Sequence, residues 1–114
     1  MKGEAQLQYI CVKWFRYQYP KILIFAIPNG GSRNIIEASN LKRQGVLPGV
    51  PDLFIPLAKG NYYGMFIEMK FGDNKLTEHQ RIIMSELLKK YYYATVCRSF
   101  DSFKETVENY INLK

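Results

Sequence analysis

The sequence predicts an α/β fold with a mixed central sheet of about four strands flanked by helices. Its 114 residues fit one domain, and its 47% hydrophobic content is sufficient for one core. Helical and strand patterns alternate in the order helix, strand, helix, strand, strand, helix, strand, helix. Helices interleaved with a central hairpin are typical of a sheet covered by helices. We therefore expect one domain over residues 1–114.

The first half of the chain supplies two helices and one strand. Residues 4–18 carry apolar side chains at helical spacing, and Pro20 ends this predicted helix. The short apolar run at residues 22–27 predicts a buried strand. Residues 33–44 predict a polar helix, which ends where Gly45 can take a left-handed conformation.

The centre of the chain predicts a hairpin. Residues 47–51 contain two prolines and predict a rigid, extended connector. Residues 53–57 and 62–71 follow the strand pattern on either side of a turn that contains Gly60. A cluster of turn-forming residues after position 71 ends the second strand.

Two capping patterns mark helices in the last third of the chain. The stretch from Thr77 to Gln80 matches a capping box and predicts a helix that continues to about residue 90. Residues 93–98 predict the fourth strand. A second capping box, from Ser102 to Glu105, predicts the start of a closing helix that ends at residue 113.

The bulk properties favour some partners and exclude others. A net charge of +6 favours polyanions, although a solvated basic surface without a partner would look the same. Cys11 and Cys97 lie in apolar patterns and indicate small buried hydrophobes, with no disulfide framework and no zinc pair. No apolar stretch approaches ~18 residues and the N-terminus lacks a signal pattern, so we expect a cytoplasmic protein without a membrane partner.

A candidate reaction centre lies on the predicted hairpin. Glu68 and Lys70 are two positions apart on a strand, so their side chains project from the same face. If the turn centres on Gly60, paired residue numbers sum to 120, and Asp52 then lies opposite Glu68. Two facing carboxylates repel unless a cation lies between them, and Mg²⁺ commonly binds one or two carboxylates. A lysine beside metal and phosphate can orient an attacking water or offset charge in the transition state.

Two further polar residues lie on apolar helix faces. Glu4 is on the apolar side of the first helix, which favours a place at the reaction centre, although acidic residues also prefer the first turn of a helix. Gln80 either completes the capping box or reaches the centre. Asp73-Asn74-Lys75 repeats the spacing of Glu68 and Lys70, but it lies in a turn and lacks a carboxylate partner. We exclude Asp73 from the predicted site.

Several motifs together resemble the VRR-NUC family of the PD-(D/E)XK nuclease superfamily. They are Gly49-Val50-Pro51-Asp52, Ile67-Glu68-Met69-Lys70, Leu76-Thr77-Glu78-His79-Gln80 and the segments at residues 4–8, 27–33 and 92–99. The resemblance implies a restriction-endonuclease-like core that binds Mg²⁺ or Mn²⁺. It implies Asp52 and Glu68 as metal ligands, the Met69 carbonyl as a further ligand, and Lys70 as the catalytic lysine. It also implies Glu4, as a further metal ligand, and Gln80 as supporting site residues. Tyr91 occupies a position where the family usually has glycine.

The resemblance also implies a substrate and an assembly. A chain with little beyond this domain is similar to stand-alone VRR-NUC proteins of phages and mobile elements, which are associated with homodimers that cut branched DNA such as four-way junctions. Symmetric cutting needs two sites, which a two-fold dimer supplies. A phage-encoded protein would act in the host cytoplasm. The predicted DNA contacts are Asn29, Arg33, Lys42, Arg43, Lys75 and Arg81.

Two other functions are compatible with the sequence. An inactive nucleic-acid-binding module, or a subunit of a larger nuclease, would bind DNA without cutting it. A sequence-specific restriction enzyme of the same superfamily would need a target-recognition region, and the segments between the predicted elements are too short to supply one. The sequence therefore favours a metal-dependent, structure-selective endonuclease.

Overall fold

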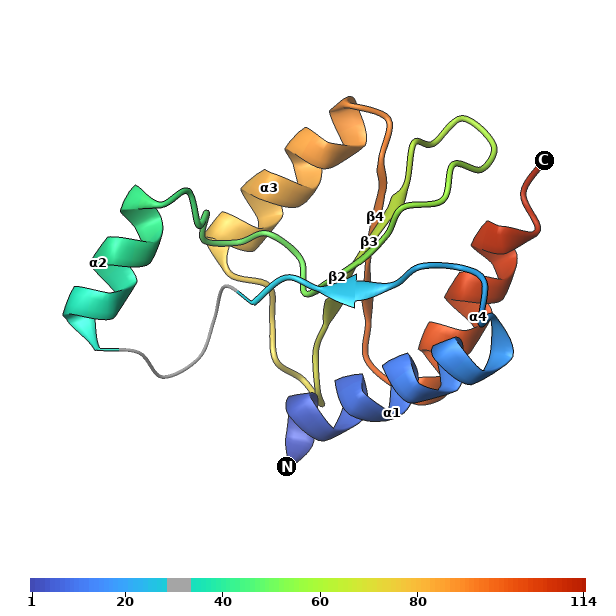
Figure 1. Ribbon diagram of the computed structural model, residues 1–114, viewed down its shortest axis with the longest axis horizontal. Coiled ribbons are helices and arrows are strands. Elements are labelled where there is room, and N and C mark those ends of the chain that lie inside the picture. Colours follow the sequence, from blue (N-terminus) through green and yellow to red (C-terminus); the bar gives the residue numbers. More distant parts are fainter. Residues whose placement is uncertain (29–33) are drawn as a thin grey trace.

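The computed structural model describes residues 1–28 and 34–114, and its helices and strands follow the predicted order (Figure 1). The helices are α1 (Gly3–Gln18), α2 (Ile35–Arg43), α3 (Glu78–Lys89) and α4 (Phe100–Ile111). The strands are β1 (Phe25–Ala26), β2 (Leu53–Ile55), β3 (Met65–Met69) and β4 (Tyr93–Cys97). None of the described helices is long and apolar enough to cross a membrane.

The strands form one mixed sheet in the order β1-β2-β3-β4. β2 pairs antiparallel with both β1 and β3, whereas β3 pairs parallel with β4. Parallel neighbours need a crossover connection, and α3 provides it. In the β2–β3 hairpin, Leu53 faces Ile67 and Ile55 faces Met65, so the paired numbers sum to 120. The predicted register is confirmed, and its next step places Asp52 beside Glu68.

One face of the sheet, called the covered face, packs against α1 and α4 (Figure 1). The buried core consists of the following residues from these helices, the strands and the segment before β1: Cys11, Phe15, Ile24, Leu53, Ile55, Met65, Ile67, Met69, Cys97, Phe103, Val107 and Tyr110. Both cysteines are free and buried, as predicted. Burial, together with the neighbouring Cys97, raises the pKa of the Cys11 thiol to about 12, so Cys11 is an unreactive hydrophobe at neutral pH.

The opposite face, called the open face, carries Phe54, Phe66 and Glu68, because strand side chains alternate. α3 packs against β4, and Gln80 at its start contacts Glu68, which places α3 on this face. In the described part of the chain, α2 packs against no other helix or strand and has no buried residue. Figure 1 shows α2 standing apart from the rest of the molecule. The open face is therefore only partly covered.

The strand predicted over residues 22–27 is mostly wrong. Only Phe25 and Ala26 pair with β2, and both are exposed, whereas Ile24 is buried just before the strand. β1 lies at the edge of the sheet, where it can pair only with the short strand β2. An apolar run indicates a preference for burial, but it does not indicate whether a neighbouring strand is long enough to pair with it.

The predicted ends of several elements also differ. α4 begins at Phe100, because the Ser99 side chain accepts a hydrogen bond from the Ser102 N–H and caps the helix; the capping box predicted at Ser102 lies inside its first turn. The connector before Asp52 is not extended throughout, because the chain turns at Pro48 and Gly49. The second hairpin strand ends at Met69, two residues earlier than predicted.

Candidate active site

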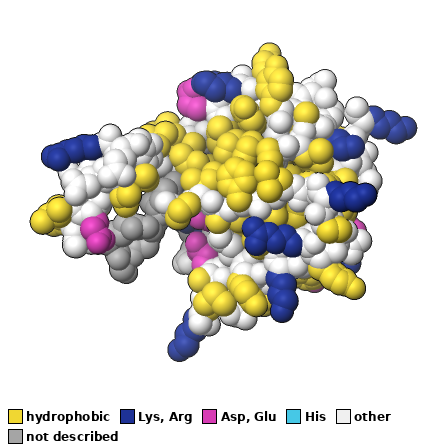
Figure 2. Space-filling model, viewed as in Figure 1, with side chains coloured by type: hydrophobic (Ala, Val, Ile, Leu, Met, Phe, Trp, Pro, Cys, Tyr) yellow, Lys and Arg dark blue, Asp and Glu magenta, His cyan; other side chains and the backbone are white. Residues whose placement is uncertain are grey.

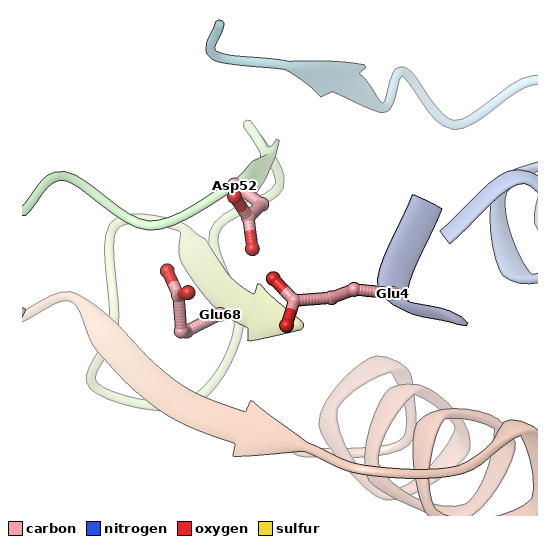
Figure 3. Close-up of side chains that lie close together, drawn as sticks. All are labelled: Glu4, Asp52 and Glu68. Carbon is pink, nitrogen blue, oxygen red and sulfur yellow. The ribbon is translucent and has the colours of Figure 1, made fainter. Parts of the chain in front are cut away.

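Three carboxylates converge at one end of the sheet (Figure 3). Glu4 comes from the first turn of α1, Asp52 from the residue before β2, and Glu68 from β3. One carboxylate oxygen of each lies within 4.8 Å of the other two. Asp73, which repeats the same short motif, is exposed in a turn and is not part of this group. Elements far apart in the sequence therefore supply a compact set of oxygen donors.

Asp52 is held by the backbone of β3. Its carboxylate oxygen Oδ2 accepts a hydrogen bond of 2.8 Å from the Met69 N–H. Its own carbonyl accepts a 2.7 Å bond from the Ile27 N–H, which continues the pairing of β1 and β2. Burial raises the pKa of Asp52, although the Met69 N–H and the neighbouring Lys70 counteract part of that shift. The side chain is fixed in place but costly to ionise.

Glu68 is the most confined of the three carboxylates, with only 2% of its surface exposed. Its Oε2 accepts a 3.0 Å hydrogen bond from the Gln80 amide and lies 3.7 Å from the Lys70 ammonium. Burial and the charge of Asp52 nevertheless raise the pKa of Glu68 to about 8. One lysine does not compensate for these crowded carboxylates, and a second positive charge at this point would favour their ionised forms.

Gln80 performs both of the functions that its sequence position suggested. Its Oε1 accepts a hydrogen bond from the Thr77 N–H at 2.9 Å, which closes the capping box of α3. Its Nε2 donates to Glu68. Because the cap fixes the amide orientation, Glu68 receives a donor whose position is set by the start of a helix.

Lys70 follows the last residue of β3 and is buried. Its N–H donates to the Cys97 carbonyl, which keeps the backbone in register with β4 beyond the end of the strand. The backbone of Met69 faces the other way, toward Asp52, as its N–H bond shows. The N–H and C=O of one residue in a strand point to the same edge, so the Met69 carbonyl lies on the edge of β3 that faces β2.

Gly49 is a residue that the sequence reasoning did not assign to the site. Its φ is +95°, and a Cβ at this position would lie 2.5 Å from the His79 carbonyl oxygen. Only glycine lets the connector approach the start of α3 so closely. This contact brings the segment that carries Asp52 next to the helix that carries Gln80. A glycine between two prolines was the available signal, because such a turn needs an unusual backbone conformation.

The donor set suits a divalent cation. Carboxylate oxygens, together with water and backbone carbonyl oxygens, are the ligands that Mg²⁺ and similar hard cations prefer. The pKa values of Asp52 and Glu68 are raised because the carboxylates are buried close together without a cation between them. Glu4, Asp52 and Glu68 therefore fit the metal that the sequence motif implies.

The predicted DNA contacts are distributed more widely. Lys42 and Arg43 lie in the last turn of α2, and Lys75 lies in the loop before α3. Arg81 is on α3 and forms an exposed ion pair with Glu78 at 3.4 Å. Asn29 and Arg33 lie outside the described residues. The described candidates are all exposed, and they come from three separate segments.

Comparisons with known proteins agree on one relationship. A sequence model of the family described as "VRR-NUC domain" matches residues 2–101. A solved structure described as "VRR_NUC domain protein" is similar with a TM-score of 0.82 and 29% sequence identity, over 99% of this chain and 91% of that chain. Among curated proteins, none matches this chain.

Proposed function

The chain belongs to the VRR-NUC domain family, and on that premise we propose that it is a metal-dependent DNA endonuclease. The family implies nuclease-type chemistry with DNA as the substrate. The observation that supports the finer proposal is the convergence of Glu4, Asp52 and Glu68 beside a buried lysine. Inactive relatives would have no need to keep such a costly set of charges together.

In this proposal, Asp52 and Glu68 are the principal ligands of Mg²⁺ or Mn²⁺, with Glu4 and the Met69 carbonyl as further ligands. A divalent cation bound there would polarise phosphoryl oxygens and lower the pKa of bound water. The Met69 N–H fixes the Asp52 carboxylate, and Gln80 fixes that of Glu68. These hydrogen bonds hold the ligands in place before substrate arrives, which reduces the reorganisation needed during the reaction.

Lys70 has the catalytic role in this proposal. Its ammonium lies beside Glu68 and is shielded from bulk water, so its hydrogen bonds are stronger than those of an exposed lysine. It orients the water that attacks phosphorus and stabilises the negative charge that develops on the phosphoryl oxygens. A new P–O bond forms to water as the P–O bond to the leaving strand breaks, and the leaving oxygen takes up a proton.

For the substrate, we propose branched DNA such as a four-way junction, cut by a homodimer in the cytoplasm. Exposed basic side chains on α2, on α3 and in the loop before α3 would contact phosphates without reading bases. Two sites related by a two-fold axis match the symmetry of a four-way junction. A backbone-reading enzyme of this kind should show little base preference and a steep dependence of affinity on salt.

A cleavage panel tests the proposal. Four-way junctions, flaps, splayed arms, linear duplexes and single strands are each incubated with the protein in Mg²⁺, in Mn²⁺ and with a chelator. We expect junction cleavage that the chelator abolishes, and a loss on the order of 10³-fold in Asp52→Asn and in Lys70→Ala. Asp73→Asn is the matched control, because it removes the carboxylate of the repeated motif outside the site and should leave the rate unchanged.

Each alternative gives a different result in the same panel. Full activity of either site variant would refute the assigned residues. Tight binding of junctions without cleavage in either metal would support a nucleic-acid-binding module or a subunit of a larger nuclease instead. Equal cleavage of linear and branched DNA would retain the nuclease and remove the structure selectivity.

A further inference from the structure

Five aromatic side chains form a continuous row that begins on β1 and ends beside the start of β4. Neighbouring ring centroids are 5.7 Å, 4.3 Å, 5.5 Å and 5.9 Å apart along the row. In order, the row consists of Phe25, Phe54, Phe66, Tyr92 and Tyr63. Strand alternation places Phe54 and Phe66 on the same face as Asp52 and Glu68. The row is therefore part of the open face and adjoins the proposed active site.

This surface has the character of a protein interface. All five rings retain exposed area, and Phe25 at the edge of the sheet is 40% exposed. Figure 2 shows a broad hydrophobic area over α3 and the adjoining strands, with lysine and arginine side chains at its periphery. An apolar centre with a charged rim is the usual anatomy of a protein–protein contact. A DNA surface would instead have its positive charges at the centre.

The same chain has an apolar helix without a partner. In α2, Ile35 is 88% exposed and Ile36 is 73% exposed, and no residue of the helix is buried. A helix of 9 residues is marginal in water on its own, so its stability depends on packing an apolar side. Within the described residues, no other helix or strand of this chain provides that packing.

We propose that α2 of one copy packs on the aromatic row of a second copy, and that the two-fold-related contact completes a dimer. A second copy is favoured because one chain carries both halves of the contact, so a two-fold pairing leaves neither half uncovered. Aromatic side chains bury roughly 150–250 Å² each, and Tyr63 is 65% exposed and Ile35 88% exposed, so these two surfaces could supply a large part of the roughly 800 Å² per partner of a standard interface. The proposal names the surface of the homodimer proposed above and rests on that assembly.

The placement has a consequence for the reaction. Because the row adjoins Asp52 and Glu68 along the same strands, a dimer formed here holds its two carboxylate clusters beside the interface at a fixed separation. A branched substrate with a matching distance between scissile phosphates would then engage both sites. Substrate selectivity would follow from the interface as well as from basic residues.

The first test is the oligomeric state of the full chain by analytical ultracentrifugation. We expect wild type to be a dimer at micromolar concentration and Ile35→Asp/Ile36→Asp to be a monomer, with a dimer dissociation constant at least ~10²-fold higher. Tyr17→Asp is the matched control, because Tyr17 is an exposed apolar residue of α1 outside both surfaces, and this variant should remain a dimer. A monomeric wild type, or a dimeric α2 variant, would overturn the proposal.

A mixing experiment identifies which surfaces meet. Phe25→Lys/Tyr63→Lys alters only the row and should also be monomeric. When it is mixed with Ile35→Asp/Ile36→Asp, one unaltered helix meets one unaltered row, and a 1:1 heterodimer should form. If both variants are monomeric and the mixture stays monomeric, like surfaces meet and the helix-on-row arrangement is wrong.

Hydrogen exchange of α2 amides shows whether α2 packs on a second copy or on its own chain. In the dimer, protection of α2 should increase with protein concentration in wild type and be absent in the α2 variant. Protection of α2 that persists in the monomeric Ile35→Asp/Ile36→Asp variant would mean that α2 folds onto its own chain, which would contradict the proposal. The outcome is independent of catalysis: a protein that dimerises through these surfaces but cuts no DNA would refute only the nuclease, and an active enzyme whose α2 variant stays dimeric would refute only the interface.

Discussion

The two faces of the central sheet are made of alternating residues of the same strands, yet they differ in burial and in charge. On the covered face, Leu53, Ile55 and Ile67 are completely buried under α1 and α4. On the open face, Phe54 and Phe66 keep exposed area, and Glu68 is buried among other charges. The covered face provides folding stability, and the open face carries exposed rings and carboxylates whose pKa values are raised by burial. Such groups indicate where other molecules bind.

The largest expected difference between the faces is in the effect of removing a ring. Phe103 is completely buried under the covered face, so Phe103→Ala should lower the free energy of unfolding by about 3–5 kcal/mol. Phe25 belongs to the open face, and Phe25→Ala should cost only about 1 kcal/mol in the monomer. Urea unfolding of both variants in the Ile35→Asp/Ile36→Asp background, where association does not contribute, provides the measurement. Equal losses would show that the two faces contribute equally to stability.

The covered face was the easier one to predict from the sequence. Apolar periodicity identified the first helix. A hairpin turn centred on Gly60, with paired residue numbers that sum to 120, gave the register between β2 and β3. Both signals are local, because they depend on spacing along the chain and on one turn. The same logic failed for residues 22–27, since the length of an edge strand depends on its neighbour in the sheet.

The candidate site was predicted in part, for a related reason. Register and motif together placed Asp52, Glu68 and Lys70 in one region, and an acidic residue on an apolar helix face identified Glu4. Gly49 was missed because a glycine between two prolines predicts a turn but does not show that the turn lies against α3. Long-range packing against another element is the information that the sequence alone did not provide.

The next prediction concerns the charged end of the open face. The pKa of Glu68 is about 8 in the folded chain against an ordinary 4.5, so the folded state binds this proton more tightly than the unfolded state. Its contribution to stability is complete below pH 4.5 and disappears as the pH rises through about 8. Glu68→Gln should therefore stabilise the metal-free protein at pH 8 by about 1 kcal/mol while it removes activity.

Thermal unfolding between pH 4.5 and 8.5 measures this effect. Glu105→Gln, at an exposed position of α4, is the matched control and should follow the wild-type profile. Adding Mg²⁺ at pH 8 should raise the melting temperature of wild type and have a smaller effect on Glu68→Gln, because a ligand stabilises only the state that binds it. A Glu68→Gln variant that is less stable than wild type at pH 8 would show that the carboxylate is not strained in the folded chain.

The last comparison is between two helix ends. α2 and α3 end with the same backbone pattern, in which an N–H bonds five residues back: Val46 to Leu41 and Tyr92 to Leu87. The residue before that N–H takes a positive φ in both, at 108° for Gly45 and 68° for Tyr91. Glycine adopts this conformation freely, whereas a side chain there costs roughly 1–2 kcal/mol. Tyr91 is the one described non-glycine residue with a positive φ.

The Tyr91 ring offsets part of this backbone cost, since it contacts Tyr63 at the end of the aromatic row, with centroids 6.4 Å apart. Tyr91→Ala should lose the ring contact and keep the strain, whereas Tyr91→Gly should lose the ring contact and release the strain. We therefore expect Tyr91→Gly to be about 1 kcal/mol more stable than Tyr91→Ala by urea unfolding of the monomer. If the two variants are equally stable, the backbone at this helix end is not strained. The contact between the Tyr91 and Tyr63 rings then has no backbone cost to offset.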